Sequence, residues 1–402
     1  MLLQLSWRNT WRNRKRSGII MAAVMVGLAS GLFLMAFLHG MVQQRVETAV
    51  QQEVSHIQIH HPAFRKDLEP TYVIPDAASL LQAIRYRRDI KAVAARVVFK
   101  GMIGSPSGSS GVIIQGVQPE PEDGVTGLET KLVAGTYFTA TPNELLIGEK
   151  LLRKLRLKKG SKAVLTFQDK DGNMAATAFR IRGVYRTVNT PYDETHVFVK
   201  NTDIDSLAGI QGDWNEIALL LKDGSRMEEI QRELSDQFPA TEILNWKEIA
   251  PEIGLTVTAS EQMAYIFTGI IILALAFGIV NTMLMAVLER SGEIRMLLSL
   301  GMSRMRIFSM IVLETLFLVL AGCPGGLGIA LITIGITNRT GLHFEKFTEV
   351  YQSFGYRDVI HPSLKNEQLV QVLVLIVCTA LLAAIVPAWK AIRLRPAGTP
   401  KN

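Results

Sequence analysis

Four long apolar runs divide this chain, and a long polar stretch separates the first run from the other three. Each run is long enough to cross the roughly 30 Å hydrocarbon core of a membrane as a helix. A cleaved signal peptide is the alternative for the first run, but that run is longer than an ordinary signal sequence and no A-x-A site follows it. The pattern predicts four transmembrane helices, at residues 19–40, 262–288, 307–337 and 368–389.

The polar stretch at residues 41–261 has the patterns of a folded domain rather than of a linker. Short segments with alternating apolar residues, such as SHIQIHH and AVAARVVFKGMIG, predict strands. Asn143–Leu157 is expected to form a helix, and Asp171-Gly172 to turn a hairpin. About 220 residues can bury a core of their own. We therefore expect a membrane α-helical protein with four transmembrane helices and a large α+β extracytoplasmic domain inserted between the first and second helices.

Basic residues beside the apolar runs predict the orientation of the chain. They cluster in three segments outside the runs, at residues 1–18, 289–306 and 390–402. With four spans these segments lie on one side of the membrane, which the positive-inside bias makes the cytoplasm. Both termini are then cytoplasmic, and the domain and the loop 338–367 are extracytoplasmic. Trp7 and Trp11, among the basic residues of segment 1–18, are typical of an interfacial helix.

Small residues in the first run predict a close helix–helix interface. Ala23, Gly27 and Gly31 repeat every four residues, so one face of the predicted helix has little side-chain volume. Such a face permits another helix to approach closely. The approaching helix is one of this chain or of a partner subunit.

The third run contains two features that are unusual in a membrane helix. Pro324 stands beside two glycines, and we expect a kink or break there. Glu314 is costly to leave in lipid. It is expected either to pair with Arg304 or Arg306 near the cytoplasmic end, or to take part in coupling a docked partner to the spans.

The connector 289–306 is too polar for hydrocarbon and contains a short predicted helix. Ser291 is expected to cap this helix and Gly301 to end it. The helix either docks on a soluble partner or lies on the lipid headgroups. Helical spacing places three residues on its apolar face, Ile294, Leu297 and Leu298.

Composition agrees with a membrane protein that carries a substantial polar domain. The chain has 402 residues, of which 48% are hydrophobic and 20% charged, and its formal net charge is +7. The basic residues border apolar runs, which indicates membrane orientation rather than nucleic-acid binding. The two cysteines lie within apolar runs and suggest neither a disulfide framework nor a metal site. No phosphate-binding loop, zinc-binding H-E-x-x-H or catalytic triad signature occurs, so any hydrolytic chemistry would belong to a separate subunit.

The residues of the connector carry a resemblance to a known family. Glu289-Arg290-x-x-Glu293-Ile294, followed by Leu300-Gly301 and a basic stretch, resembles the cytoplasmic coupling helix of MacB/FtsX-type (type VII) ABC transporter permeases. The polar domain is similar to that family's outer domain in the order of its segments GVIIQGVQPEPE, KLVAGTYF, NELLIGEKLLRKLRLKKGSKAVLTF and FRIRGVYRTVNTPYDETHVFV. In that fold a β-rich outer lobe, here about 101–213, is inserted between two halves of a membrane-proximal lobe, about 41–100 and 214–261. SHIQIHHP after the first span looks most like the lipoprotein-releasing, Lol-type branch.

The resemblance implies partners for this chain. It predicts one half of a homo- or heterodimer of permease subunits in the inner membrane of a bacterium, working with two copies of an ATPase that binds ATP and Mg²⁺. No cofactor in this chain and no nucleic-acid partner are expected, and membrane lipids surround the spans. The resemblance assigns ATPase coupling to nine residues: Glu289, Arg290, Glu293, Ile294, Arg295, Leu297, Leu298, Gly301 and Arg304.

A polar tip between two predicted strands is a possible docking loop. In Lol-type complexes a loop of the outer lobe docks a periplasmic lipoprotein carrier, and the candidate residues here are Asn189, Thr190, Pro191 and Tyr192. An ordinary hairpin is the alternative.

Three functions follow from the resemblance. The first is mechanotransmission, in which ATP-driven motion is passed to the outer domain to release lipoproteins from the inner membrane to a carrier. The second is MacB-like efflux or export with an adaptor and an outer-membrane channel. The third is FtsX-like signalling to a cell-wall hydrolase, against which the large outer domain argues.

Overall fold

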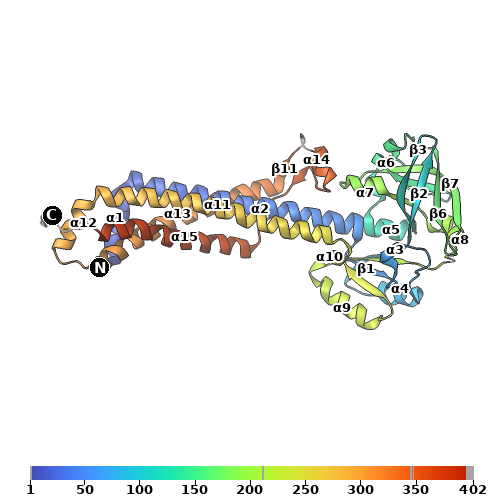
Figure 1. The fold of residues 1–402 in the computed structure, drawn as a ribbon, viewed down its shortest axis with the longest axis horizontal. Coiled ribbons are helices and arrows are strands. Elements are labelled where there is room, and N and C mark those ends of the chain that lie inside the picture. Colours follow the sequence, from blue (N-terminus) through green and yellow to red (C-terminus); the bar gives the residue numbers. More distant parts are fainter. Residues whose placement is uncertain (1, 211, 345, 347, 395–402) are drawn as a thin grey trace. The chain divides into compact units, whose positions relative to one another are not determined.

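A computed structural model describes residues 2–210, 212–344, 346 and 348–394. The chain divides into two compact units, which we treat separately (Figure 1). The helical unit comprises the chain up to Val42, residues 257–343, and the chain from Val359 onward. The α+β unit comprises Gln43–Thr256 and Phe344–Asp358. Most of the predicted tail 390–402 lies outside the described residues, because the description ends at residue 394.

Four helices in the described chain are long and apolar enough to cross a membrane, which confirms the predicted fold class. They share one hydrophobic core. Each extends beyond the predicted span at both ends, because helical hydrogen bonding continues into polar flanks that a hydropathy pattern does not mark. The four helices are α2 (Arg14–Ala49), α11 (Pro251–Glu289), α13 (Arg304–Thr340) and α15 (Asn366–Ile392).

Of the predicted kink or break at Pro324, the break is wrong, because helix α13 continues through this residue; the kink stays a prediction. The glycines near the proline serve instead for a close approach of α13 to α2. A Cβ atom on Gly326 would lie 3.0 Å from the Cα of Met25, and one on Gly322 would lie 3.1 Å from the carbonyl oxygen of Met21. Small residues of this kind let two membrane helices pack backbone to backbone.

The remaining elements of the helical unit are short. Helix α1 (Leu2–Arg12) precedes α2, and α12 (Ser291–Ser299) lies between α11 and α13. Two strands, β11 (Leu342–His343) and β12 (Val359–Ile360), pair antiparallel.

The α+β unit is built on a ten-stranded sheet in the order β10-β1-β9-β2-β3-β8-β5-β7-β4, with β6 paired to both β2 and β7. This double pairing closes a barrel of six strands, β2, β3, β8, β5, β7 and β6 (Figure 1). The strands are β1 (Ile57–His60), β2 (Ile90–Ser105), β3 (Gly108–Val117), β4 (Leu132–Gly135), β5 (Glu144–Gly148), β6 (Lys162–Gln168), β7 (Met174–Tyr185), β8 (His196–Lys200), β9 (Glu216–Leu221) and β10 (Glu242–Asn245).

The two largest hydrophobic cores of this unit lie inside the barrel and on the open part of the sheet. Apolar residues that alternate along the strands point into the barrel, where Phe99 and Phe167 lie 4.7 Å apart between ring centroids. A second core lies where α4 and α9 pack on the open part of the sheet. The helices of the unit are α3 (Phe64–Asp67), α4 (Ala77–Arg85), α5 (Pro119–Thr126), α6 (Glu149–Lys154), α7 (Thr190–Thr195), α8 (Asn201–Ala208), α9 (Met227–Gln237), α10 (Trp246–Ile249) and α14 (Thr348–Ser353).

Strand β2 belongs both to the closed barrel and to the open part of the sheet. It pairs with β9 through Arg96 and with β6 from Gly101 onward, and it continues unbroken between these contacts. Arg96 is fully buried, and its guanidinium donates to Glu122 at 2.7 and 2.9 Å and to Glu216 at 2.7 Å. This buried ion cluster joins β2, α5 and β9.

The predicted helix at Asn143–Leu157 is wrong over its first half. Residues 144–148 form β5, which pairs with β7 on one side and β8 on the other, and only residues 149–154 are helical. All five strand residues are buried. A strand buried on both faces has a continuous apolar run without alternation, so its pattern does not differ from that of a helix.

Candidate functional site

The connector between α11 and α13 forms helix α12, as the sequence predicted, but its start differs. Arg290 is the N-cap residue and makes no side-chain capping bond, while Ser291 is already helical, so the predicted cap is wrong. Gly301 ends the helix with a φ of 88°. The amide of Gly301 donates to the carbonyl of Leu298, and that of Met302 to the carbonyl of Leu297, both at 3.1 Å, which is a Schellman motif.

The apolar face of α12 packs on the helical unit itself. Ile294 is 4% exposed and belongs to the core of the four long helices, and Leu298 packs against that core. In this structure Ile294 is therefore covered by the chain itself and Leu298 partly so, and their predicted role in ATPase coupling stays a prediction. The opposite side of α12, which we call the outer face, is exposed, and it comprises Gly292, Arg295, Ser299 and Leu300.

Helix α1 is held against α13 by small polar residues. Ser6 and Thr10, one turn apart, are buried, and the Ser6 hydroxyl donates to the carbonyl of Met310 at 3.3 Å. Trp7 meets Phe317 of α13 edge to face, with 5.5 Å between ring centroids. Buried small side chains allow the two helices to lie close.

An ion network joins α1, α2, α12 and α13. Glu314 is 3% exposed and accepts from Arg290 at 3.3 Å and from Arg16 at 3.4 Å. Arg290 also donates to Glu293 at 3.1 Å, and Arg12 donates to Glu293 at 2.5 Å. Glu314 is thus the buried carboxylate that connects the start of α2 with the start of α12.

The predicted partners of Glu314 are wrong. Arg304 and Arg306 are exposed, and the network uses Arg16 and Arg290 instead. Arg16 ends the basic cluster just before the first span, and Glu314 lies early in the third span. In a four-span arrangement these two positions lie at a similar depth in the membrane, and this similarity could have indicated the pair. Arg16 also lies 3.6 Å from the exposed carboxylate of Glu289.

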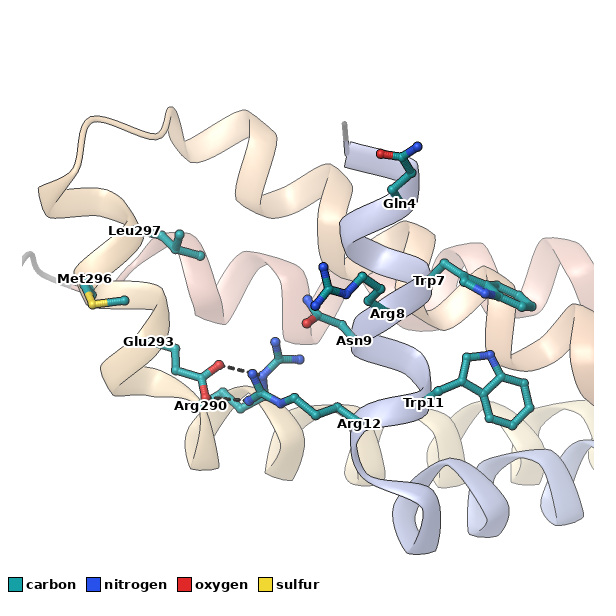
Figure 2. A pocket seen from close by; sticks show the side chains of 10 residues that line it. All are labelled: Gln4, Trp7, Arg8, Asn9, Trp11, Arg12, Arg290, Glu293, Met296 and Leu297. Carbon is teal, nitrogen blue, oxygen red and sulfur yellow. Dashed lines mark hydrogen bonds and ion pairs between the residues drawn. The ribbon is translucent and has the colours of Figure 1, made fainter.

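A groove of about 1170 Å³ lies between α1 and α12. Figure 2 shows Arg8, Asn9 and Arg12 on the side of α1 toward α12, while Trp7 and Trp11 point to the other side. The Arg12 guanidinium, hydrogen-bonded to Glu293, holds the pKa of that carboxyl below its ordinary value. The groove is lined by Gln4, Trp7, Arg8, Asn9, Trp11, Arg12, Arg290, Glu293, Met296 and Leu297.

The small residues of the first span do not form a single interface. Gly31 is buried near Val372 of α15, and a Cβ on Gly27 would contact Leu275 of α11 at 3.5 Å. Ala23 is exposed. The two glycines thus face helices of this chain, and only Ala23 is open to lipid or to a partner.

The predicted docking tip is a short helix, α7, and not an open loop. The Asn189 side chain caps it by accepting from the Tyr192 amide at 3.4 Å. Tyr192 is buried and stacks on His196, with 3.9 Å between ring centroids, so in this structure its side chain is not available for docking. Pro191 is exposed, and Asn189 and Thr190 are partly exposed.

Asp193 of α7 makes the α+β unit sensitive to pH. Its carboxylate is 1% exposed and accepts from the amide and hydroxyl of Thr187, and burial raises its pKa from 3.8 to about 7. A carboxyl whose pKa is raised on folding stabilises the protein most below its unfolded pKa. That contribution is lost as the pH rises from about 4 to about 7, and amounts to at most about 4 kcal/mol.

We therefore expect Asp193→Asn to raise stability at pH 8 and to flatten its pH dependence between pH 4 and 7. The melting temperature of the detergent-solubilised chain, measured across this range, gives the result. Glu194→Gln, which removes the neighbouring, partly exposed carboxylate, should keep the wild-type slope. An unchanged slope in Asp193→Asn would contradict the assignment.

Comparison with known proteins identifies relatives along most of the chain. Residues 17–237 match the family described as MacB-like periplasmic core domain, and residues 265–396 match the FtsX-like permease C-terminal family. An uncharacterized ABC transporter permease of Methanocaldococcus jannaschii is 25% identical over 55% of this chain, and the match spans only 54% of that relative. The lipoprotein-releasing system transmembrane protein LolC of Xylella fastidiosa is 21% identical over 71% of each chain. Among solved structures, the periplasmic region of MacB from Actinobacillus actinomycetemcomitans covers 53% of this chain and 98% of its own, with a TM-score of 0.36 and 15% identity.

Proposed function

The chain belongs to the ABC transporter permeases that combine a MacB-like periplasmic core domain with an FtsX-like permease domain, and on this premise we propose that it releases lipoproteins from the inner membrane by mechanotransmission. Permeases of this family have no catalytic activity of their own. ATP and Mg²⁺ would be bound by two copies of a partner ATPase, and a second permease subunit, identical or different, would complete the transporter.

Continuous helices support the transmission of motion. Helix α2 is 36 residues long and contains Arg16 of the ion network near its start. Its last residues, 43–49, belong to the α+β unit. Helix α11 begins in that unit at Pro251 and ends at Glu289, next to Arg290 of the network. A helix of 36 residues is about 54 Å long. In the proposed mechanism, a displacement at the network acts on both of these helices.

The outer face of α12 is the surface best suited to the ATPase. Ile294 is buried and Leu298 is partly buried by the chain itself, whereas Leu300 is 76% exposed beside the exposed Arg295 and Ser299. An exposed apolar side chain with a polar rim is typical of an interface anchor. The ion network connects α12 to α2 and α13 through Arg290 and Glu314. A partner that displaces α12 would therefore also displace these membrane helices.

The match to LolC over 71% of both chains carries the proposal of a lipoprotein cargo. Removing acyl chains from a membrane into water costs about 0.8 kcal/mol per CH₂ group, which sums to tens of kcal/mol for two or three chains. The cargo must therefore pass along apolar protein surface to a periplasmic carrier. Helix α11 offers such a surface, because Ile266, Ile270 and Phe277 are all exposed on it.

Depletion of this protein in its source organism is expected to make mature outer-membrane lipoproteins accumulate in the inner membrane. Fractionation of the two membranes followed by immunoblotting measures the effect, and expression of the wild-type chain should reverse it. Normal lipoprotein sorting in the depleted strain, together with new sensitivity to a drug or exported toxin, would reject the release of lipoproteins and favour MacB-like efflux.

A further inference from the structure

The groove between α1 and α12 has a surplus of positive charge. Three guanidinium groups line it, from Arg8, Arg12 and Arg290, against the single carboxylate of Glu293. Arg12 and Arg290 both bind Glu293, and Arg290 also binds Glu314. Arg8 is exposed and has no ion pair or hydrogen bond with any residue that the structure describes. One cationic group on the groove wall is therefore available to a ligand.

The same groove also has an apolar border. Trp7 and Trp11 line it, both are exposed, and Trp7 packs on Phe317 within the third membrane helix. Tryptophan side chains are enriched where acyl chains meet headgroups. Since Trp7 and Trp11 lie on one side of α1 and Arg8 and Arg12 on the other (Figure 2), an occupant that contacts both sets must be amphiphilic.

We propose that this groove binds the headgroup of an anionic phospholipid of the cytoplasmic leaflet, with the phosphate on Arg8 and Arg12 and the acyl chains beside Trp7 and Trp11. Guanidinium groups bind phosphate oxygens through paired N–H bonds. The cavity of about 1170 Å³ exceeds the volume of an ordinary small-molecule site. With the tryptophan side of α1 placed toward the hydrocarbon, a soluble protein would reach only the arginine side.

The bound lipid would act on α12. Arg12 donates to Glu293, so a phosphate that attracts Arg12 competes with the bond that fixes α12 to α1. The lipid thereby adjusts how firmly the proposed coupling helix is held. This proposal depends on the cytoplasmic position of α1, and it does not depend on which cargo the transporter carries.

The test uses the full chain in lipid nanodiscs, in a Trp389→Phe background that removes the tryptophan at the end of α15. Phosphatidylglycerol or phosphatidylcholine, brominated on the acyl chains, is added as a minor component, and quenching of tryptophan fluorescence is measured. We expect several-fold stronger quenching by the anionic lipid. Arg8→Gln with Arg12→Gln should abolish this preference, and Arg8→Gln alone, which disturbs no ion pair among the described residues, should weaken it.

A matched double variant removes the same charge outside the groove. Arg14 and Lys15 are exposed and do not line it, so Arg14→Gln with Lys15→Gln should keep the preference. Equal quenching by the two lipids, or equal loss in both double variants, would overturn the proposal in favour of general surface attraction. Loss of the preference in millimolar inorganic phosphate would identify a site for free anions. Loss of the lipid preference on addition of the partner ATPase would identify a protein-docking groove. Loss in phosphate or loss with the ATPase would each overturn the proposal.

Discussion

Glu314→Gln is expected to destabilise the helical unit by about 3–5 kcal/mol and to uncouple transport from ATP hydrolysis. The wild-type carboxylate is 3% exposed and lies between Arg16 and Arg290, whose side chains are only 11% and 17% exposed. A neutral amide would leave two buried guanidinium groups without a counter-charge, which costs far more than the loss of an exposed pair. Helix α12 would then lose its link to α2. The melting temperature of the solubilised chain and the transport activity of the reconstituted complex measure the two effects.

Glu289→Gln is the matched control for this substitution. Glu289 also faces Arg16, at 3.6 Å, but its side chain is 50% exposed. Exposed ion pairs contribute about 0–1 kcal/mol, so this variant should melt close to the wild type and transport normally. If both variants lose the same stability, or if Glu314→Gln transports normally, the buried network does not connect α12 to the spans.

Leu300→Asp is expected to weaken binding of the ATPase by at least about thirtyfold, equivalent to 2 kcal/mol or more for the loss of an interface anchor. Leu300 is 76% exposed, so the substitution should leave the stability of the isolated chain nearly unchanged. Association is measured by co-purification and by titration of labelled ATPase onto the solubilised permease.

Ile294→Val separates the two faces of α12. Ile294 is buried in the helical core, so this variant should lose about 0.5–1.5 kcal/mol of stability and keep normal affinity for the ATPase. The reverse result, with weak association in Ile294→Val and normal association in Leu300→Asp, would show that the inner face of α12 turns outward to dock.

The elements with a local signature could be predicted from the sequence. Continuous apolar runs marked the four long helices, because a helix in lipid needs apolar residues on every side. Alternating residues marked strands such as β6 and β7, along which buried and more exposed positions alternate. The positive φ of Gly301 explains why that glycine indicated the end of α12.

The features that depend on distant residues could not be predicted. Barrel closure requires β6 to pair with residues 101–104 of β2, and the local sequence of neither segment indicates that the other is its partner. The buried ion clusters of Arg96 and Glu314 likewise combine side chains from separate parts of the chain. For α12, helical spacing identified an apolar face, but spacing alone does not tell whether the chain itself or a partner covers that face.

The glycine contacts between α13 and α2 restrict which helices can move in a transport cycle. At Gly322 and Gly326 the backbone of α13 meets Met21, Val24 and Met25 of α2 with no intervening side chain of its own. Sliding by one helical turn, about 5.4 Å, would press bulkier residues of α13 against these atoms and open a void behind them. Helices α2 and α13 are thus expected to move together as one rigid body under a force along their axes. Shear within the helical unit should then occur at α11, where Gly27 of α2 meets the flexible side chain of Leu275.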